Sequence, residues 1–387
     1  MTIFHDQNGA IGVPAILTPE RQRPLTVATK LPPAKLVRTV ERARHHLLRL
    51  HQRLAPAPAV MMELIFAAWM SQAIAVAADL GIADTRAKEP LRIDQLATRV
   101  GADPDALSRL LRVLISRGIF RQLPDGCYDL TPLAATLVSQ APASMAAMAR
   151  YVGSRQHREH WSLLVDAVRT GESVIPKLRG KDGAEYVSEE PELCEIFNQA
   201  MTNISELAVA PIVASYDFTR YRTIIDVGGG HGRLLAAILA ATPAAQGVLF
   251  DLPQVVAGAE PLLRKHDVAD RVRVAEGSFF DRVPGGGDAY ILKSVIHDWP
   301  DDRAVQILRN VRAAAATGTT VLLVEFVMPN HNREFPGKLV DLQMLVELGA
   351  RERTASEYRR LLEQAGLRMT RVLQTVGPFS LVEAKAA

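Results

Sequence analysis

The sequence predicts an α/β protein: a Rossmann-like, mostly parallel sheet with an antiparallel edge strand, preceded by an all-helical region with a winged-helix pattern. Three observations support this fold class. From Arg222 onward, short β-branched apolar runs alternate with helical stretches, which is the pattern of βαβ units. The first of these runs leads directly into a glycine-rich segment. Before Arg222, the spacing of apolar residues is mostly helical.

Five runs in the C-terminal part predict parallel strands, because each is short, apolar and rich in β-branched residues. They are RTIIDVG (222–228), GVLFDLP (247–253), RVRVAEG (271–277), DAYILKS (288–294) and TTVLLVEF (319–326). Helices are expected at 233–241, 254–265, 302–315 and 354–366. Two last strands, RMTRVLQT and FSLVEAKA, are joined by a short turn, which predicts an antiparallel pair at one sheet edge.

The helical part contains a helix, VMMELIFAAWMSQAIAVAADLGI (60–82), that is apolar on almost every side. Such a helix is expected to be buried, and it often marks a subunit interface. Two amphipathic helices and a hairpin of IFRQL and CYDLT follow, which is a winged-helix pattern. Its second helix carries Arg109, Arg112 and Arg117 without a larger basic surface, so a structural or dimerising role is favoured over DNA binding.

Composition divides the chain into four parts. Residues 1–57 form an extension that is expected to be partly disordered, with one basic helix at 35–54. Residues 58–150 form the winged-helix-like domain, 151–218 the linking helices and 219–387 the sheet domain.

Charge and cysteine content exclude several classes of protein. With 45 basic and 42 acidic residues, the net charge of +3 gives no reason to expect a nucleic-acid partner. Cys127 and Cys194 form no metal motif and no disulfide framework, which fits a reducing, cytoplasmic compartment. No apolar run is expected to span a membrane, and the N-terminal sequence lacks a signal-peptide pattern.

The strongest local signal is Asp226-Val227-Gly228-Gly229-Gly230-His231-Gly232, where a strand meets glycines and then a helix. Glycines let the backbone turn sharply and approach a ligand closely. A dinucleotide loop requires G-x-G-x-x-G, but here glycine falls at 228, 230 and 232, and Arg233 takes the last required place. The spacing therefore favours a ligand without a pyrophosphate over NAD, and a tight turn without any ligand is the simpler alternative.

Two further strand ends point to a nucleoside. Asp251 ends the second strand, where a carboxylate accepts both ribose hydroxyls of an adenosine. NAD and S-adenosylmethionine both carry that ribose, so Asp251 does not separate them. Ser278 and Phe279 follow the third strand, and Phe279 is a candidate to flank an adenine ring, with a core aromatic as the alternative.

His297 lies just past the fourth strand, at the edge where open α/β sheets bind ligands. A phenol has a pKa near 10, so at neutral pH its hydroxyl is a poor nucleophile, whereas histidine has a pKa near 6.5. A neutral imidazole that removes the hydroxyl proton as the oxygen attacks typically raises the reaction rate by about 10²–10⁴-fold. A carboxylate that orients the other ring nitrogen improves such a base. Glu325, at the end of the fifth strand, is the stronger candidate, and Glu352 is the second. No spacing of potential ligands predicts a metal site.

At these residues the sequence resembles the two-domain small-molecule O-methyltransferases, which include plant caffeic acid and flavonoid enzymes and bacterial polyketide-tailoring enzymes. The likeness covers about residues 58–385. The motifs that carry it are the loop 226–232, Phe250-Asp251-Leu252-Pro253, Lys293 with His297-Asp298-Trp299, Glu325, Glu352-Arg353-Thr354, and the helix Phe197-Asn198-Gln199-Ala200-Met201 with Ser205. The loop resembles the family's cofactor loop, and the motif at 250–253 resembles its ribose-binding motif. Lys293 and the segment 297–299 resemble the segment with the adenine contact and the catalytic base, and Glu325 and Glu352 resemble the two acids beside that base. The helix at 197–205 resembles one that lines the pockets for the methyl donor and the acceptor.

The resemblance implies a class I methyltransferase sheet, S-adenosylmethionine as cofactor, no metal, and a homodimer formed through a winged-helix part that binds no DNA. The cofactor residues that it implies are Asp226, Gly228, Gly230, Gly232, Asp251, Leu252, Ser278, Phe279, Lys293 and Ser205. Many members of the family carry an aspartate where this chain has Ser278.

The resulting hypothesis is methyl transfer from S-adenosylmethionine to a hydroxyl of an aromatic small molecule. His297 removes the proton, the oxygen attacks the sulfonium methyl, and S-adenosylhomocysteine leaves. The expected pocket residues are Trp161, Phe197, Met201, Asp298 and Met344, and their mostly apolar character favours a phenol or polyketide-like acceptor. The alternatives are an N- or C-methyltransferase on the same scaffold, a catalytically inactive regulator and an NAD-dependent oxidoreductase.

Overall fold

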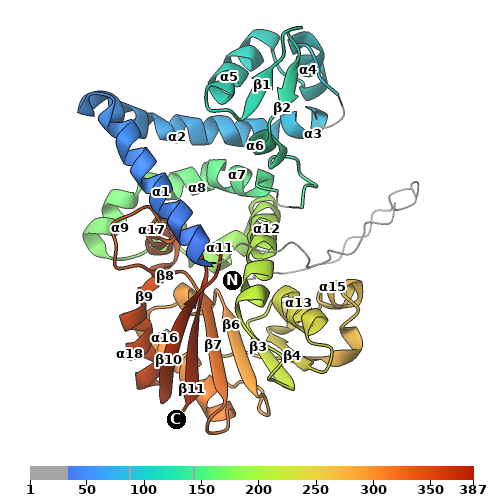
Figure 1. Cartoon of the computed structure of the whole chain (residues 1–387), viewed down its shortest axis with the longest axis vertical. Helices are drawn as coiled ribbons and strands as arrows, with labels where there is room; N and C mark the ends of the chain where they lie inside the picture. Colours follow the sequence, from blue (N-terminus) through green and yellow to red (C-terminus); the bar gives the residue numbers. More distant parts are fainter. Residues whose placement is uncertain (1–33, 87–88, 143) are drawn as a thin grey trace. The chain divides into compact units, whose positions relative to one another are not determined.

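The structure, a computed structural model, describes residues 34–86, 89–142 and 144–387. The disorder expected for residues 1–33 lies outside this described part. The chain divides into two units, each described by itself. The sheet unit holds residues 166–188 and 208–387 with the start of helix α1 up to Glu41, and the helical unit holds residues 42–165 and 189–207 (Figure 1).

A seven-stranded sheet forms the centre of the sheet unit, in the order β10-β11-β7-β6-β3-β4-β5. Strands β3 to β7 pair in parallel, whereas β11 runs antiparallel between β10 and β7. The five parallel strands and the antiparallel edge predicted from the sequence are confirmed. The strands are β3 (Thr223–Val227), β4 (Gln246–Asp251), β5 (Val272–Glu276), β6 (Ala289–Lys293), β7 (Thr320–Glu325), β10 (Leu367–Gln374) and β11 (Ser380–Ala386).

Helices cover both faces of this sheet, because successive strand residues point to opposite sides. Ile224 and Leu249 pack toward α13 and the end of α12, whereas Ile225 and Val248 pack toward α16 and α18. The helices that belong wholly or partly to this unit are α1 (Ala34–Arg53), α9 (Leu164–Thr170), α10 (Ile175–Arg179), α11 (Gly183–Glu189), α12 (Pro191–Ser215), α13 (Arg233–Ala241), α14 (Pro253–Val256), α15 (Glu260–Lys265), α16 (Asp301–Ala314), α17 (Gly337–Leu348) and α18 (Ala355–Gln364), with the 3-10 turns η1 (Ala269–Arg271) and η2 (Ile296–Asp298).

One predicted helix differs from the structure. The range 254–265 contains two short helices, α14 and α15, instead of one. Gly258 lies between them, and a Cβ atom there would lie 2.8 Å from Nε2 of His231. The helix therefore breaks at a glycine that packs closely against the glycine-rich loop.

The carboxyl ends of β3, β4, β6 and β7 lie at one edge of the sheet, because these strands are parallel and β4, β3, β6 and β7 are successive neighbours. The segments that follow them carry the glycine-rich loop, Asp251, His297 and Glu325. Beyond β7, a two-stranded parallel sheet of β8 (Val327–Met328) and β9 (Arg353–Thr354) brings residue Glu352 to the same edge. The sequence analysis did not predict this small sheet.

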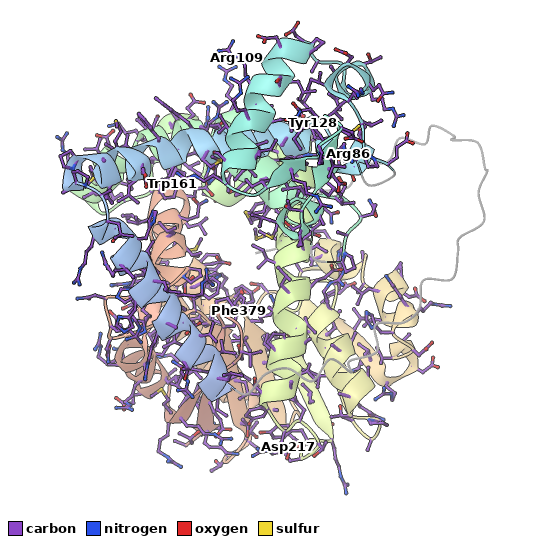
Figure 2. The ribbon with its side chains drawn as sticks, turned by 45° about the horizontal axis from the view of Figure 1, so that its top comes forward. Arg86, Arg109, Tyr128, Trp161, Asp217 and Phe379 are labelled. Carbon is purple, nitrogen blue, oxygen red and sulfur yellow. The ribbon has the colours of Figure 1, made fainter. Side chains whose placement is uncertain are left out.

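The helical unit has a core of its own, built by several helices and one hairpin. The hairpin strands pair antiparallel, as the sequence predicts. Figure 2 labels Arg109 on α5 and Tyr128 in the hairpin. The elements are α2 (Ala57–Asp79), α3 (Ile82–Arg86), α4 (Ile93–Val100), α5 (Pro104–Ser116), β1 (Phe120–Gln122), β2 (Tyr128–Leu130), α6 (Pro132–Ala135), α7 (Ala146–Gly153) and α8 (Arg155–Ser162).

Helix α2 contradicts two sequence expectations. It is not buried in the single chain, because apolar side chains such as Ile65, Phe66 and Trp69 are exposed. It is also 23 residues long and apolar enough to meet the length and composition of a membrane span, although no such run was expected. Its exposed apolar surface has no cover among the described residues of this chain. An exposed apolar surface of this kind is typical of an interaction surface.

Candidate active site

The loop after β3 has a backbone that glycine adopts most easily. Gly228, Gly230 and Gly232 have φ angles of 68°, 60° and 81°, all in the left-handed region that costs other residues strain. The N–H of Gly228 donates to the carbonyl of Phe250 at 2.8 Å. The loop is therefore tied to the end of β4, next to Asp251.

Asp226 lies under this loop as a buried carboxylate. A Cβ atom on Gly229 would lie 2.7 Å from the Cγ of Asp226, so the loop needs glycine there. Burial raises the pKa of Asp226 to about 7, although nearby Lys293 favours its charged form. Its Oδ2 atom has no hydrogen-bond partner among the described residues. A buried acid with an unpaired oxygen, beneath the consecutive glycines 228–230, fits a ligand that carries positive charge or N–H groups.

Asp251 is fixed beside the loop by two backbone donors. Its Oδ2 atom accepts the N–H of Gly230 at 2.9 Å, and its Oδ1 atom accepts the N–H of Leu252 at 2.7 Å. Burial raises the pKa of Asp251, while these two hydrogen bonds oppose that rise. Each carboxylate oxygen has a second lone pair, so both remain able to accept hydroxyl groups of a ligand.

Phe279 lies next to the glycine-rich loop, where the sequence predicts an aromatic beside the ligand. A Cβ atom on Gly228 would lie 3.5 Å from its Cε1 atom. Asn310 holds this segment by donating to the carbonyl of Phe279 at 2.9 Å. Ser278 instead serves the turn itself, because its Oγ atom accepts the N–H of Phe280 at 3.1 Å.

The segment that carries His297 leaves β6 through a strained residue. Ser294 has a φ of 53°, which is rare for a residue other than glycine. Glu325, fully buried at the end of β7, accepts the N–H of Val295 at 3.2 Å and that of Ile296 at 2.9 Å. These hydrogen bonds fix the start of the η2 turn and thereby the direction of the His297 backbone.

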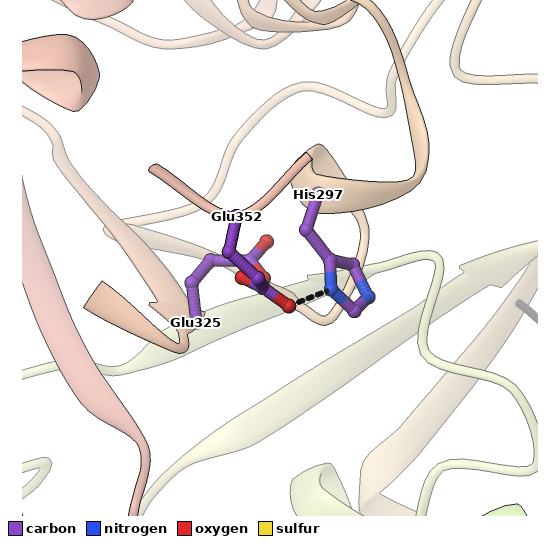
Figure 3. Close-up of side chains that lie close together, drawn as sticks. All are labelled: His297, Glu325 and Glu352. Atoms are coloured by element: carbon purple, nitrogen blue, oxygen red, sulfur yellow. Dashed lines mark hydrogen bonds and ion pairs between the residues drawn. The ribbon is translucent and has the colours of Figure 1, made fainter. Parts of the chain in front are cut away.

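Glu352, not Glu325, orients the His297 ring, so the sequence preference for Glu325 is wrong. The Nδ1 atom of His297 and the Oε1 atom of Glu352 are 2.7 Å apart (Figure 3). The physical reason is that one oxygen of Glu325 is already used by two backbone N–H groups, whereas the pairing of β9 with β8 delivers Glu352 to the ring. The Glu352 side chain is fully buried, and the His297 side chain is 12% exposed.

The charges around His297 favour its protonated form. Burial lowers its pKa, but Asp298, Glu325 and Glu352 outweigh burial and raise the pKa of His297 to about 9. Asp298 lies closest to the second ring nitrogen, with Oδ1 3.4 Å from Nε2. Burial also raises the pKa of Glu325 to about 7, so this acid can hold a proton near neutral pH.

The sequence analysis missed the structural role of Arg353, which is 1% exposed. Its Nη1 atom donates to the carbonyl of Ile296 at 2.9 Å, and its Nη2 atom donates to the carbonyl of Trp299 at 2.7 Å. The guanidinium also pairs with Asp301 at 2.7 Å. The Arg353 side chain thus holds the backbone before and after His297. Because Arg353 is the residue next to Glu352, it also ties the Glu352 segment to the His297 segment. Arginine is rarely buried, so the motif Glu352-Arg353-Thr354 alone did not indicate this role.

Replacing Arg353 with lysine is expected to lower both the melting temperature and kcat, because one ammonium cannot reproduce a planar fork of donors. Each buried carbonyl that loses its hydrogen-bond donor lowers the free energy of unfolding by about 1–3 kcal/mol, and the carbonyls of Ile296 and Trp299 both depend on Arg353. Scanning calorimetry and steady-state kinetics measure the two effects. Arg360→Lys, on the exposed face of α18, is the matched control. Wild-type behaviour of the Arg353→Lys variant would contradict this role.

The remaining predicted residues fall in both units. Asp298 belongs to the sheet unit, as does Met344 on α17, a helix that contacts η2. Trp161 on α8 (Figure 2) and three residues of α12 belong to the helical unit, and their place in a pocket beside His297 stays a prediction. Those residues of α12 are Phe197, Met201 and Ser205.

The cluster of His297, Glu325 and Glu352 also meets the distance criterion for a metal site, because one potential ligand atom of each lies within 4.8 Å of the others. The 2.7 Å separation of Nδ1 and Oε1 is, however, a hydrogen-bond distance. One oxygen of Glu325 also already accepts two N–H groups. Hydrogen bonds thus account for one oxygen of each acid, whereas Oε2 of Glu325 and Oε2 of Glu352 have no hydrogen-bond partner among the described residues. The expected absence of a metal stays a prediction.

Comparisons with known proteins match almost the whole of the described chain. Residues 161–368 match the model of the O-methyltransferase domain, and residues 62–140 match that of the O-methyltransferase dimerisation domain. The phenazine O-methyltransferase PhzM of Lysobacter antibioticus is 41% identical over 330 residues, which is 85% of this chain and 96% of that protein. The 8-amino-8-demethylriboflavin N,N-dimethyltransferase of Streptomyces davaonensis is 32% identical, over 80% of this chain and 89% of that protein.

Solved structures agree with these relatives. The crystal structure of LaPhzM has a TM-score of 0.80 at 40% identity, covering 86% of this chain and 100% of that one. NcsB1, an O-methyltransferase from neocarzinostatin biosynthesis in complex with S-adenosylmethionine and 2-hydroxy-5-methyl naphthoic acid, has a TM-score of 0.70 at 33% identity, covering 82% and 96%. The chain therefore belongs to the O-methyltransferase family, as an S-adenosylmethionine-dependent enzyme with the class I methyltransferase fold.

Proposed function

We propose that the enzyme methylates a hydroxyl group of an aromatic small molecule, with His297 as the general base. The observation that carries the proposal is the 2.7 Å hydrogen bond between His297 and the fully buried Glu352. This bond occupies Nδ1, so Nε2 is the ring atom left for proton transfer. A histidine oriented by a carboxylate, at the ligand-binding edge of an α/β sheet, is the arrangement that base catalysis requires.

In the proposed reaction, each residue of the cluster has its own task. Glu352 accepts the hydrogen bond of Nδ1–H and thereby keeps the neutral ring unprotonated at Nε2. That nitrogen takes the proton of the acceptor hydroxyl. Glu325 and Arg353 hold the backbone around His297 in place. Bound S-adenosylmethionine supplies an electrophilic methyl group on its sulfonium.

The raised pKa of His297 has two opposing effects on this reaction. A pKa of about 9 lies close to that of a phenol, about 10, so proton transfer between them is nearly balanced. The same pKa leaves only roughly one ring in a hundred neutral at pH 7. The enzyme is therefore expected to work best in mildly alkaline solution.

The cofactor is proposed to bind at the loop 228–232, with Asp226 and Lys293 beneath it, Asp251 at the ribose and Phe279 beside the adenine. The orphaned oxygen of Asp226 and the fixed carboxylate of Asp251 support this assignment. Leu252, Ser278 and Ser205 are assigned to the cofactor through the family resemblance.

Replacing Asp251 with asparagine is expected to raise the dissociation constant of S-adenosylhomocysteine by about 10–100-fold, because hydrogen bonds to a charged acceptor are worth roughly 1.5–3 kcal/mol. Isothermal titration calorimetry measures this change. Asp270→Asn, at an exposed site of the same unit, is the matched control. Unchanged affinity in the Asp251 variant would remove this carboxylate from the cofactor site.

The acceptor class is supported by the pocket candidates and by the relatives. Trp161, Phe197, Met201 and Met344 are mostly apolar side chains, which suit an aromatic ring. The matched relatives are named for phenazine and naphthoate chemistry, and one is named an N,N-dimethyltransferase. That last relative keeps N-methylation as the second candidate function, for which His297 would be dispensable as a base.

We also infer a homodimer. The dimerisation-domain match and the exposed apolar side chains of α2 support it, since a second copy would cover them. The hairpin of β1 and β2 is then the wing of a winged-helix-like dimerisation domain rather than a DNA reader. A cytoplasmic location without nucleic-acid or membrane partners completes the proposal.

An assay with labelled S-adenosylmethionine tests the function. The acceptors are hydroxylated phenazines, naphthoates and quinones, each paired with its amino counterpart. Label on the hydroxylated compounds supports O-methylation. Label on the amino compounds alone supports the second candidate. Tight S-adenosylhomocysteine binding with no transfer, together with salt-sensitive DNA binding, would favour an inactive regulator.

A further inference from the structure

Helix α1, ahead of the dimerisation domain, carries a narrow apolar stripe. Its residues recur at alternating intervals of four and three, which is the a/d pattern of a coiled-coil seam. We call them the leucine stripe: Leu36, Val40, Ala43, Leu47 and Leu50 on α1, with Leu54 directly after its end. Leu47, Leu50 and Leu54 are 64%, 55% and 78% exposed. A regular and exposed apolar seam of this kind is typical of a helix face that packs against another surface.

The part of the stripe from Ala43 onward belongs to the helical unit together with α2. His51 near the end of α1 lies 3.9 Å from Glu63 near the start of α2. Helix α2 exposes Ile65 and Trp69, so exposed apolar side chains continue from one helix to the next. The dimerisation-domain match begins at residue 62. Helix α1 is therefore an addition that extends the surface of that domain.

Charge decides which surface of a second copy suits the stripe. The positions that flank it from residue 44 to its end are Arg44, His46, His51 and Arg53, without an acidic residue. Two α1 helices side by side would place the positive charges of Arg44 and Arg53 together, which destabilises a coiled coil. Helix α2 has only acidic residues among its charged side chains, Glu63 and Asp79. The apolar face of α2 in the second copy is thus the better partner.

We propose that α1 is a dimer arm whose leucine stripe packs on α2 of a second copy of this chain. The proposal rests on the proposed homodimer and extends its interface beyond the matched domain. A basic amphipathic helix also suits an anionic membrane surface. The stripe is, however, a narrow seam, with Val37 and Leu48 as the further large apolar side chains of α1, and α1 lacks Trp, Tyr and Phe. Both features favour a protein partner.

The test compares two double variants of the full chain by mass photometry and sedimentation at nanomolar to micromolar concentration. Leu47→Gln with Leu50→Gln removes the centre of the stripe. Arg42→Gln with Arg49→Gln makes the same number of changes at exposed positions off the stripe, and leucine, arginine and glutamine have similar helix propensities. The stripe variant is expected to dissociate at least about tenfold more readily than wild type, and the control within about twofold.

The outcomes separate the arm from the dimer itself. A wild-type chain that is monomeric throughout overturns the homodimer and the arm together. A wild-type dimer with an equally tight stripe variant overturns only the arm. Co-sedimentation with phosphatidylserine vesicles supplies the third comparison. Vesicle binding that the stripe variant loses, with unchanged dimer affinity, would assign the stripe to membranes and overturn the proposal.

Discussion

Replacing His297 with alanine or glutamine is expected to lower kcat by about 10²–10⁴-fold, which is the typical contribution of a positioned general base. The dissociation constant of S-adenosylhomocysteine is expected to stay within about threefold of wild type, because the side-chain partners of His297 are Glu352 and Asp298, not the loop at 228–232. Steady-state kinetics and calorimetry on the same preparations measure both quantities.

The glutamine variant separates chemistry from folding. Alanine leaves the buried Glu352 carboxylate without its partner, which destabilises the site. Glutamine can still donate a hydrogen bond but cannot accept a proton at neutral pH. If the glutamine variant kept near-normal turnover, His297 would not be the base, and N- or C-methylation would become the better account.

The second large effect is expected in the pH dependence of Glu352→Gln. In the wild type, the pKa of His297 is raised to about 9, so kcat/KM is expected to rise with pH and to level off above that value. Removing the Glu352 charge lowers the pKa of His297, so the rise is expected to move to lower pH by about one unit or more. The plateau is expected to fall by about 10²-fold or more, because a neutral amide no longer fixes the ring tautomer.

The raised pKa of His297 also makes the free energy of unfolding depend on pH. The interactions that raise the pKa of His297 contribute stability that is complete below the pKa of the unfolded state, about 6.5, and that is lost as pH rises through about 9.

Glu363→Gln, at an exposed site of α18, is the control for Glu352→Gln and is expected to leave the pH profile of kcat/KM in place. An unmoved profile in Glu352→Gln would contradict the electrostatic role of this acid.

Local patterns were enough to predict the sheet. Each parallel strand is a short apolar run, and the glycines at 228, 230 and 232, which all have positive φ, predict the sharp turn after β3. The positions of Asp251 and His297 at the carboxyl edge of the sheet were predictable as well, because Asp251 is the last residue of β4 and His297 lies a short way beyond the end of β6.

The partner of His297 was not predictable from strand order. Glu325 ends a predicted strand, but its oxygen binds the backbone at Val295 and Ile296. Glu352 reaches the ring only through the two-residue strands β8 and β9, which are too short to leave a pattern in the sequence. Arg353 was missed because a buried arginine is recognised only by its tertiary partners, here the carbonyls of Ile296 and Trp299.

The exposure of α2 has a different origin. Its composition predicts burial, but Ile65 and Trp69 are exposed, because no element among the described residues covers them. Sequence composition cannot distinguish a helix covered by its own chain from one covered by another copy.

The most direct test of the account is to identify the atom that receives the methyl group. Wild-type enzyme is incubated with ¹³C-methyl S-adenosylmethionine and the best acceptor from the hydroxylated panel, and the product is examined by NMR. The account predicts that the label is bonded to a phenolic oxygen and that His297→Gln forms little of this product. A label bonded to nitrogen or carbon, formed equally well by the variant, would contradict it.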